Sequence, residues 1–89
     1  MQSDAPEPVV IVRAVRTGRA TPSQWDAWTA DGTYLYLRYR WGHGDVAVGD
    51  VDGPVIAGFR HGGPWAGDIS LEEFCRRAGV VLADGVREA

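Results

Sequence analysis

Hydrophobic and polar residues alternate with a period of two along residues 33–41. One set is apolar or aromatic: Leu35, Leu37, Tyr39 and Trp41. The set between them combines tyrosine with arginine: Tyr34, Tyr36, Arg38 and Arg40. Alternation of residues that favour extended backbone predicts a half-buried strand, so one set faces a core and the other faces away from it.

The residues before this strand predict its partner, so that residues 24–41 form a β-hairpin around a turn at 30–32. A two-residue turn would pair Asp26 with Leu37 and direct both into the core. A three-residue turn, with its glycine in the left-handed region, pairs Trp25 with Leu37 and sends Asp26 to the other face. Because burying an unpaired carboxylate is costly, we expect the three-residue turn.

The remaining strands are predicted from short apolar runs between turn residues. The β-branched run at 9–12, which continues through Arg13, Ala14 and Val15, is typical of a strand inside the sheet that is buried on both faces. Turns are predicted at 42–45 and 49–54, where glycine and aspartate cluster. Short strands are expected at 46–48 and 55–61.

One helix is predicted after the glycine-rich loop at 62–68. Ser70 is a suitable N-cap, and Glu73 three residues later completes a capping box. Gly79 is a natural residue for the C-terminal cap. The apolar face has helical spacing: Leu71, Phe74, Cys75 and Ala78.

These elements predict an α+β fold. It is an antiparallel β-meander of four to five strands with one short C-terminal helix on one face. The 89 residues fit one domain at residues 9–83, with flexible tails at 1–8 and 84–89. The apolar residues 80–82 add a short edge strand or pack beneath the sheet.

Composition narrows the class of protein. A net charge of −3 gives no general attraction to nucleic acid or to an anionic membrane. The single cysteine, Cys75, excludes an internal disulfide and fits a reducing compartment. The sequence has neither an apolar run long enough to span a membrane nor a signal peptide, so we expect a cytoplasmic protein.

The first candidate site is the sheet face that combines aromatic residues with arginine. It carries Trp28, Tyr34, Tyr36, Arg38 and Arg40. Aromatic side chains and arginine are enriched at protein interfaces, and the same residues stack on bases and contact phosphates. The alternative is purely structural, because aromatic and arginine side chains on neighbouring strands also cover one another.

Two glycine-flanked histidines form the second candidate. His43 and His61 each follow strands that run the same way, so both lie at one end of the sheet, with Asp45, Asp68 and Trp65 nearby. Such a group could bind a metal or act as acid and base, but the spacing fits no zinc motif, and we favour the interpretation that these are loop histidines beside glycines of tight turns. Cys75 lies on the apolar helix face, as expected of an inert buried thiol.

Three segments resemble small uncharacterised proteins of actinobacteria and their phages. These are Ser23-Gln24-Trp25-Asp26-Ala27-Trp28, Tyr34-Leu35-Tyr36-Leu37-Arg38-Tyr39-Arg40 and Ser70-Leu71-Glu72-Glu73-Phe74-Cys75. The resemblance covers roughly residues 22–79, and it implies no activity or site residues. It implies only a context, in which short phage-borne proteins often bind a host protein.

Together these observations predict a small binding protein, a phage-derived modulator of a host protein, which uses the aromatic–arginine face and can self-associate as a homodimer. The alternatives are a binder of a nucleotide or single-stranded nucleic acid, and a small histidine-dependent enzyme. We expect no cofactor, no metal and no catalytic residues. The predicted binding residues are Trp28, Tyr34, Tyr36, Arg38, Arg40, His43, His61 and Trp65.

Overall fold

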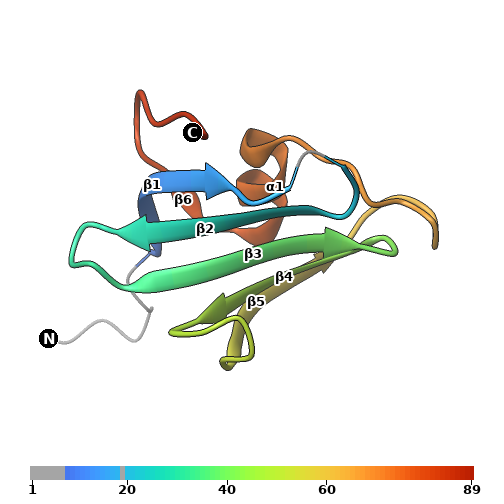
Figure 1. Ribbon diagram of the computed structural model, residues 1–89, viewed down its shortest axis with the longest axis horizontal. Coiled ribbons are helices and arrows are strands. Elements are labelled where there is room, and N and C mark those ends of the chain that lie inside the picture. The colour runs from blue at the N-terminus through green and yellow to red at the C-terminus, as the bar shows by residue number, and fades with distance from the viewer. Residues whose placement is uncertain (1–7, 19) are drawn as a thin grey trace, which may run out of the picture.

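In the computed structural model, residues 8–18 and 20–89 are described, and they form one curled sheet around a single helix (Figure 1). The strands are β1 (Val10–Arg16), β2 (Ser23–Thr29), β3 (Tyr34–Arg40), β4 (His43–Val48), β5 (Val55–Arg60) and β6 (Val81–Leu82). Their order is β5-β4-β3-β2-β1-β6, and only the β1–β6 pair is parallel. The predicted α+β class is confirmed, whereas the purely antiparallel meander of four to five strands is wrong. All but Pro8 of the predicted N-terminal tail lies outside the described residues.

The β2–β3 hairpin has the predicted register. Trp25 lies opposite Leu37, and Asp26 lies opposite Tyr36 on the other face. The turn uses Gly32 at a φ of 86°, and the Asp31 carboxylate accepts a hydrogen bond from the Thr33 amide at 3.2 Å. The register therefore follows from keeping Asp26 out of the core.

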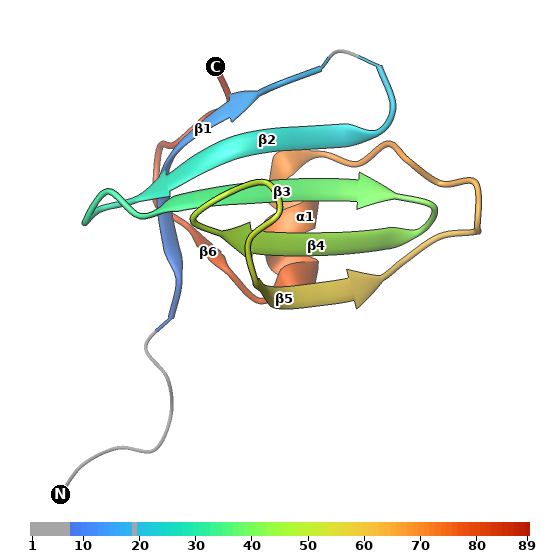
Figure 2. The same cartoon turned by 60° about the horizontal axis from the view of Figure 1, so that its bottom comes forward.

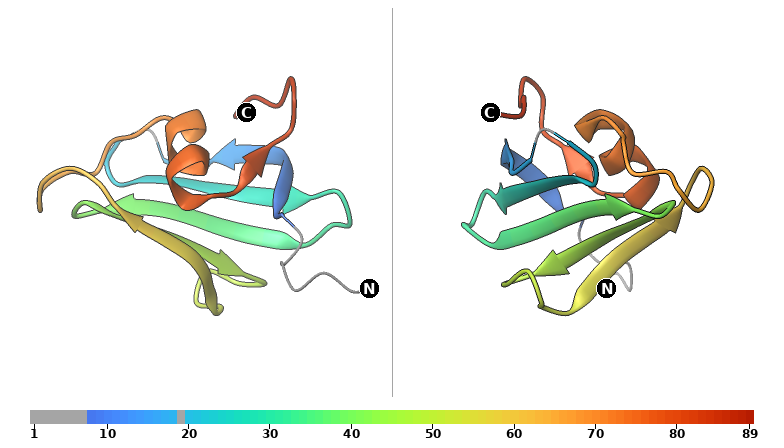
Figure 3. Two further views of the ribbon diagram at one scale, coloured as in Figure 1. Left: turned by 180° about the vertical axis from the view of Figure 1, so that it is seen from behind. Right: turned by 45° about the vertical axis from the view of Figure 1, so that its right-hand side comes forward.

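Helix α1 (Leu71–Ala78) crosses the inner, concave face of the sheet (Figure 2, Figure 3). The Ser70 hydroxyl accepts a hydrogen bond from the Glu73 amide at 3.1 Å, and Gly79 ends the helix at a φ of 76°. The caps at Ser70 and Gly79 are confirmed, but the second half of the capping box is not formed, because the Glu73 carboxylate accepts hydrogen bonds from Arg76 and Arg77 instead. No helix in the described part of the chain is long and apolar enough to cross a membrane.

A chain of aromatic contacts joins the helix to the sheet. The ring centroid of Phe74 lies 5.5 Å from that of Trp25 and 5.1 Å from that of Phe59. Phe59 in turn stacks on Tyr39 at 5.9 Å. These rings connect β2, β3 and β5 through α1, so the inner face is occupied by the core.

Strand β1 differs from its prediction. It lies inside the sheet, between β2 and β6, but only its inner face is buried. Val12, which lies within a register shift between Ile11 and Arg13, is 40% exposed, and Arg13 is also exposed. The prediction of burial on both faces is wrong because a single short helix covers only one face of this sheet.

The β3–β4 connection is shorter than predicted. Its turn consists of Trp41 and Gly42, with φ values of 54° and 71°, so Arg40 already pairs with His43. The predicted turn at 42–45 is therefore mostly strand. Gly44 has a packing role there, because a Cβ at this position would lie 2.1 Å from the ring of Phe59.

Replacing Gly44 by alanine tests this packing. Because the added methyl group must displace the Phe59 ring from the core, we expect Gly44→Ala to lower the free energy of unfolding by about 1–3 kcal/mol. Gly63→Ala is the matched control, because its Cβ would meet nothing within 4 Å. Urea denaturation measures both, and equal stabilities of the two variants would contradict the packing role.

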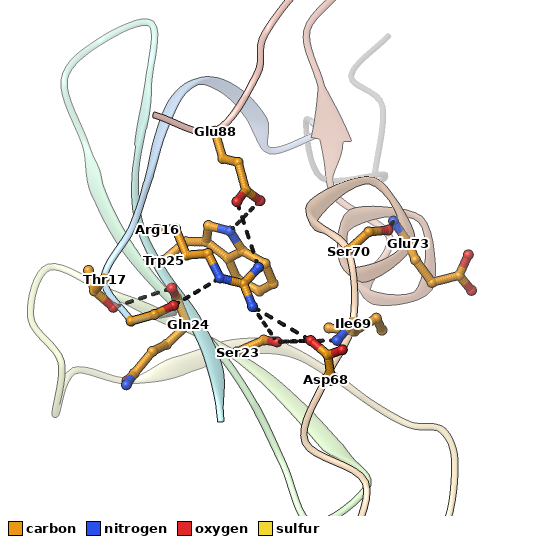
Figure 4. A network of polar contacts seen from close by, with 11 residues as sticks. Arg16, Thr17, Ser23, Gln24, Trp25, Asp68, Ile69, Ser70, Glu73 and Glu88 are labelled. Atoms are coloured by element: carbon orange, nitrogen blue, oxygen red, sulfur yellow. Dashed lines mark hydrogen bonds and ion pairs between the residues drawn. The ribbon is translucent and has the colours of Figure 1, made fainter. Parts of the chain in front are cut away.

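A polar network attaches the loop before α1 to the sheet (Figure 4). The Ser23 side chain is fully buried, and its hydroxyl oxygen accepts hydrogen bonds from Arg16 at 3.0 Å and from the Ile69 amide at 3.2 Å. The same hydroxyl donates to Asp68 at 3.2 Å. Ser23 thus satisfies a backbone amide that would otherwise be buried without a partner.

The end of the chain returns to the same place, where a flexible tail at 84–89 was expected. Glu88 accepts a hydrogen bond from the Trp25 indole at 3.0 Å and lies 3.7 Å from the Arg16 guanidinium. The Ala89 amide donates to the Ala14 carbonyl at 3.0 Å. The last residues therefore extend the parallel edge beside β1.

Ser23→Ala tests this network. The substitution leaves the buried Ile69 amide without an acceptor, so we expect a loss of about 1–3 kcal/mol in the free energy of unfolding. Thr17→Val is the control, because the Thr17 hydroxyl donates to a backbone carbonyl at an exposed position. Thermal unfolding compares the two, and a Ser23→Ala variant as stable as wild type would show that the network is dispensable.

Candidate functional site

The outer face of the sheet, turned away from α1, presents rows of residues paired across β3, β4 and β5. The row nearest the β3–β4 turn, here named the arginine row, consists of Arg40, His43 and Arg60. The next row consists of Arg38, Asp45 and Gly58. Because opposed residues in antiparallel strands share a face, these side chains all project outward.

Two hollows on this face share Arg38 and Asp45. One has a volume of about 310 Å³ and is lined by Arg38, Arg40, Trp41, His43 and Asp45. The other, of about 200 Å³, lies between the β3–β4 surface and the loop at 51–53, which folds over the outer face (Figure 2). We refer to the two hollows together as the outer groove.

Three arginines of this surface are free to bind an anion. Arg38, Arg40 and Arg60 form no ion pair with any residue that the structure describes. Elsewhere in the described residues, ion pairs hold Arg16 and both arginines of α1, whereas Arg13 and Arg87 form none. This part of the outer face therefore carries three arginines and His43 around one carboxylate, that of Asp45, on a chain whose net charge is −3.

The part of the outer face toward β1 and β2 is different, because its side chains bind one another. The Tyr34 hydroxyl donates to Asp26 at 2.5 Å, and the Tyr36 hydroxyl donates to Gln24. Burial, followed by the hydrogen bond to the Asp26 carboxylate, raises the pKa of Tyr34. The hydroxyls of both tyrosines therefore already have partners within the sheet.

Trp28 belongs to the same internally paired part. Its ring lies 5.8 Å from that of Tyr34 in an edge-to-face arrangement, and the Arg13 guanidinium lies 4.6 Å from its centroid. Cross-strand packing thus accounts for Trp28 and both tyrosines, the structural alternative that the sequence left open. Arg38 and Arg40 are the predicted face residues that remain unpaired.

Trp41 has an unusual conformation and environment. Its φ of 54° lies in the left-handed region, which a bulky residue rarely adopts. The side chain is 59% exposed, with the Arg40 guanidinium 4.1 Å from its ring centroid. The alternating pattern placed Trp41 with the core residues, and this is wrong because the strand ends one residue earlier.

Trp65 and His61 lie on the loop beside this turn. The Gly42 amide donates to the Ala66 carbonyl at 2.8 Å, and the His61 amide donates to the Gly42 carbonyl at 2.9 Å. Trp65 is 91% exposed. The two hydrogen-bonded loops thus present Trp41 and Trp65 at the same end of the sheet, which we name the tryptophan end.

The two histidines lie at one end of the sheet, as predicted, but the four-residue polar cluster does not form. His43 is in β4 opposite Arg60, and His61 follows β5. Asp68 instead binds Ser23 and Arg16. Across residues 8–18 and 20–89, no three His, Cys, Asp or Glu side chains are grouped so as to hold a metal ion.

Sequence reasoning missed Trp41 and Arg60 as site residues. Trp-Gly in place of the usual Asn-Gly of a two-residue turn was a signal available for Trp41. Arg60 joins the site only through the pairing of β5 with β4. Comparison with protein-family models, curated proteins and solved structures gives no match, so the site itself is the basis for a functional argument.

Cys75 is buried against the core, and burial, with a smaller effect of the Glu72 charge, raises the pKa of its thiol to about 11. The thiol is therefore protonated at neutral pH. We expect Ellman's reagent at pH 8 to label the folded protein at least 100-fold more slowly than the protein in denaturant. Labelling at the rate of a free thiol would show that Cys75 is accessible and reactive.

Proposed function

We propose that this chain is a small protein-binding module whose contact surface is the tryptophan end together with the arginine row. This proposal keeps the predicted role of the aromatic–arginine face but moves the contact toward the β3–β4 turn. The observation that carries it is the strained, exposed conformation of Trp41.

Trp41 occupies a position where folding favours another residue. Asparagine or glycine adopts the left-handed region easily, whereas other residues lose roughly 1–2 kcal/mol there. Because the indole is largely exposed, its burial offsets little of this conformational cost. Strained residues that persist in a small domain are concentrated at functional sites, which supports a binding role for Trp41.

Trp65 adds a second large apolar side chain at the same end. Tryptophan and arginine are the residues that most often contribute strongly to binding energy at protein interfaces. Two exposed indoles beside three unpaired arginines match that composition, and the positive charge favours an acidic partner surface. The resemblance to phage-borne proteins suggests a host protein as partner.

Replacing Trp41 by asparagine should separate stability from binding. We expect Trp41→Asn to raise the free energy of unfolding by up to about 1 kcal/mol, because it relieves the strain in the turn. The cation–π contact with Arg40 is lost at the same time, which limits the gain. Urea denaturation measures the change, and a clear loss of stability would contradict the strain argument.

Partner capture tests the surface itself. Wild-type protein, Trp41→Asn, Trp65→Ala and Trp28→Ala are immobilised and exposed to lysate of the organism that carries the protein. We expect at least one protein to be retained by wild type and by Trp28→Ala but to be reduced roughly 30-fold with either variant of the tryptophan end. A captured set that is the same for all four baits would show that this surface is not the interface.

A further inference from the structure

We propose that the outer groove binds a nucleoside phosphate, with the phosphate at Arg38 and the adjoining arginine row and the base against the indole of Trp41. This site shares Trp41, Arg40 and His43 with the proposed protein contact, whereas Trp65 belongs to the protein contact alone and does not line the groove. The larger hollow, about 310 Å³, lies within the usual size range of small-ligand pockets.

Cationic side chains gather at the groove: Arg38, Arg40 and His43 line its larger hollow, and Arg60, which lines neither hollow, adjoins them in the arginine row. Arg40, His43 and Arg60 are direct cross-strand neighbours, so their backbones lie about 4.8 Å apart along the row. Arg38 lies two residues from Arg40 on the same face. One guanidinium group can donate two parallel hydrogen bonds to the oxygens of a phosphate. None of these arginines forms an ion pair with a carboxylate among the described residues.

Trp41 supplies the surface for a planar base. Arg40 lies against the indole at 4.1 Å, and the 59% exposure of the side chain leaves further ring surface open. An aromatic face can stack on any of the bases and does not distinguish among them. The tyrosines predicted for this role, Tyr34 and Tyr36, are held by hydrogen bonds within the sheet.

Asp45 explains why the ligand is more than an inorganic anion. Its carboxylate lines both hollows beside Arg38 without forming an ion pair with it. A carboxylate repels a bare phosphate but accepts hydrogen bonds from the hydroxyls of a sugar or the amino group of a base. Gly58, on the other side of Asp45, places no side chain over this part of the groove.

Acidic residues limit the ligand to a single nucleotide. Asp50 and Asp52 lie in the β4–β5 loop, at the end of the sheet opposite the arginine row, and Asp52 lines the smaller hollow. Asp26 lies farther along the outer face, beyond Tyr36. The phosphates of a longer strand would meet these carboxylates, so the positive surface suits one nucleotide rather than a polynucleotide.

Titration calorimetry and tryptophan fluorescence with ADP test the proposal on the full chain at low salt. We expect saturable binding of one ADP per chain with quenching of fluorescence. We expect Arg38→Gln and Arg38→Glu to weaken binding at least tenfold, and Trp41→Phe to remove most of the quenching. Tyr34→Phe is the matched control and should bind ADP as wild type does, since its hydroxyl already binds Asp26.

Four outcomes would overturn the proposal. These are no saturable binding of ADP at millimolar concentration, unchanged binding in both Arg38 variants, inorganic phosphate binding as tightly as ADP, and an eight-nucleotide single strand binding more than tenfold tighter than ADP. Circular dichroism establishes that each variant is folded. Trp65→Ala should leave ADP binding unchanged, so failure of this site and failure of the proposed protein contact give different results.

Discussion

The ring of Phe74 is the contact on which the rest of this fold depends. A helix of eight residues is not stable alone, so α1 exists only because the sheet holds it. Trp25 contacts this ring from β2 and Phe59 contacts it from β5, which lie three positions apart in the sheet. The curl of the sheet thus follows from closing both sides on one helix (Figure 3). Since folding occupies the inner face, any ligand or partner must use the outer face, the ends or the edges of the sheet.

Local sequence rules predicted the parts of this fold that local interactions determine. The register of the β2–β3 hairpin follows from turn length and from the cost of burying Asp26. The bounds of α1 follow from the hydrogen bond between Ser70 and Glu73 and from the left-handed Gly79. In both cases the residues that determine the structure lie close together along the chain, so the interaction can be recognised from the local sequence alone.

Where the prediction failed, the deciding contact lies far away in the sequence. Gly44 is a residue typical of turns, and the sequence therefore predicted a turn there. In the structure the Phe59 ring fills the space that a side chain at this position would occupy. Only the pairing of β4 with β5 reveals this contact. The outer face shows the same limit. Its alternating tyrosines and arginines look equivalent in the sequence, yet Asp26 and Gln24 of β2 engage the tyrosines. Asp45 of β4 lies opposite Arg38 but forms no ion pair with it, and Arg40 lies opposite His43. Composition therefore identified the face, and strand pairing identified which part of it is free.

Trp41 links the two proposed functions physically. Its indole forms one wall of the outer groove and is also exposed at the tryptophan end, next to the loop that carries Trp65. One ring surface cannot be covered by a nucleotide base and by a protein partner at the same time. If both ligands bind, each must therefore lower the affinity for the other by the same factor, because coupling between two sites is reciprocal. Such competition would place the protein contact under the control of nucleotide concentration without any change in the fold, since the left-handed turn already holds the indole between the two surfaces.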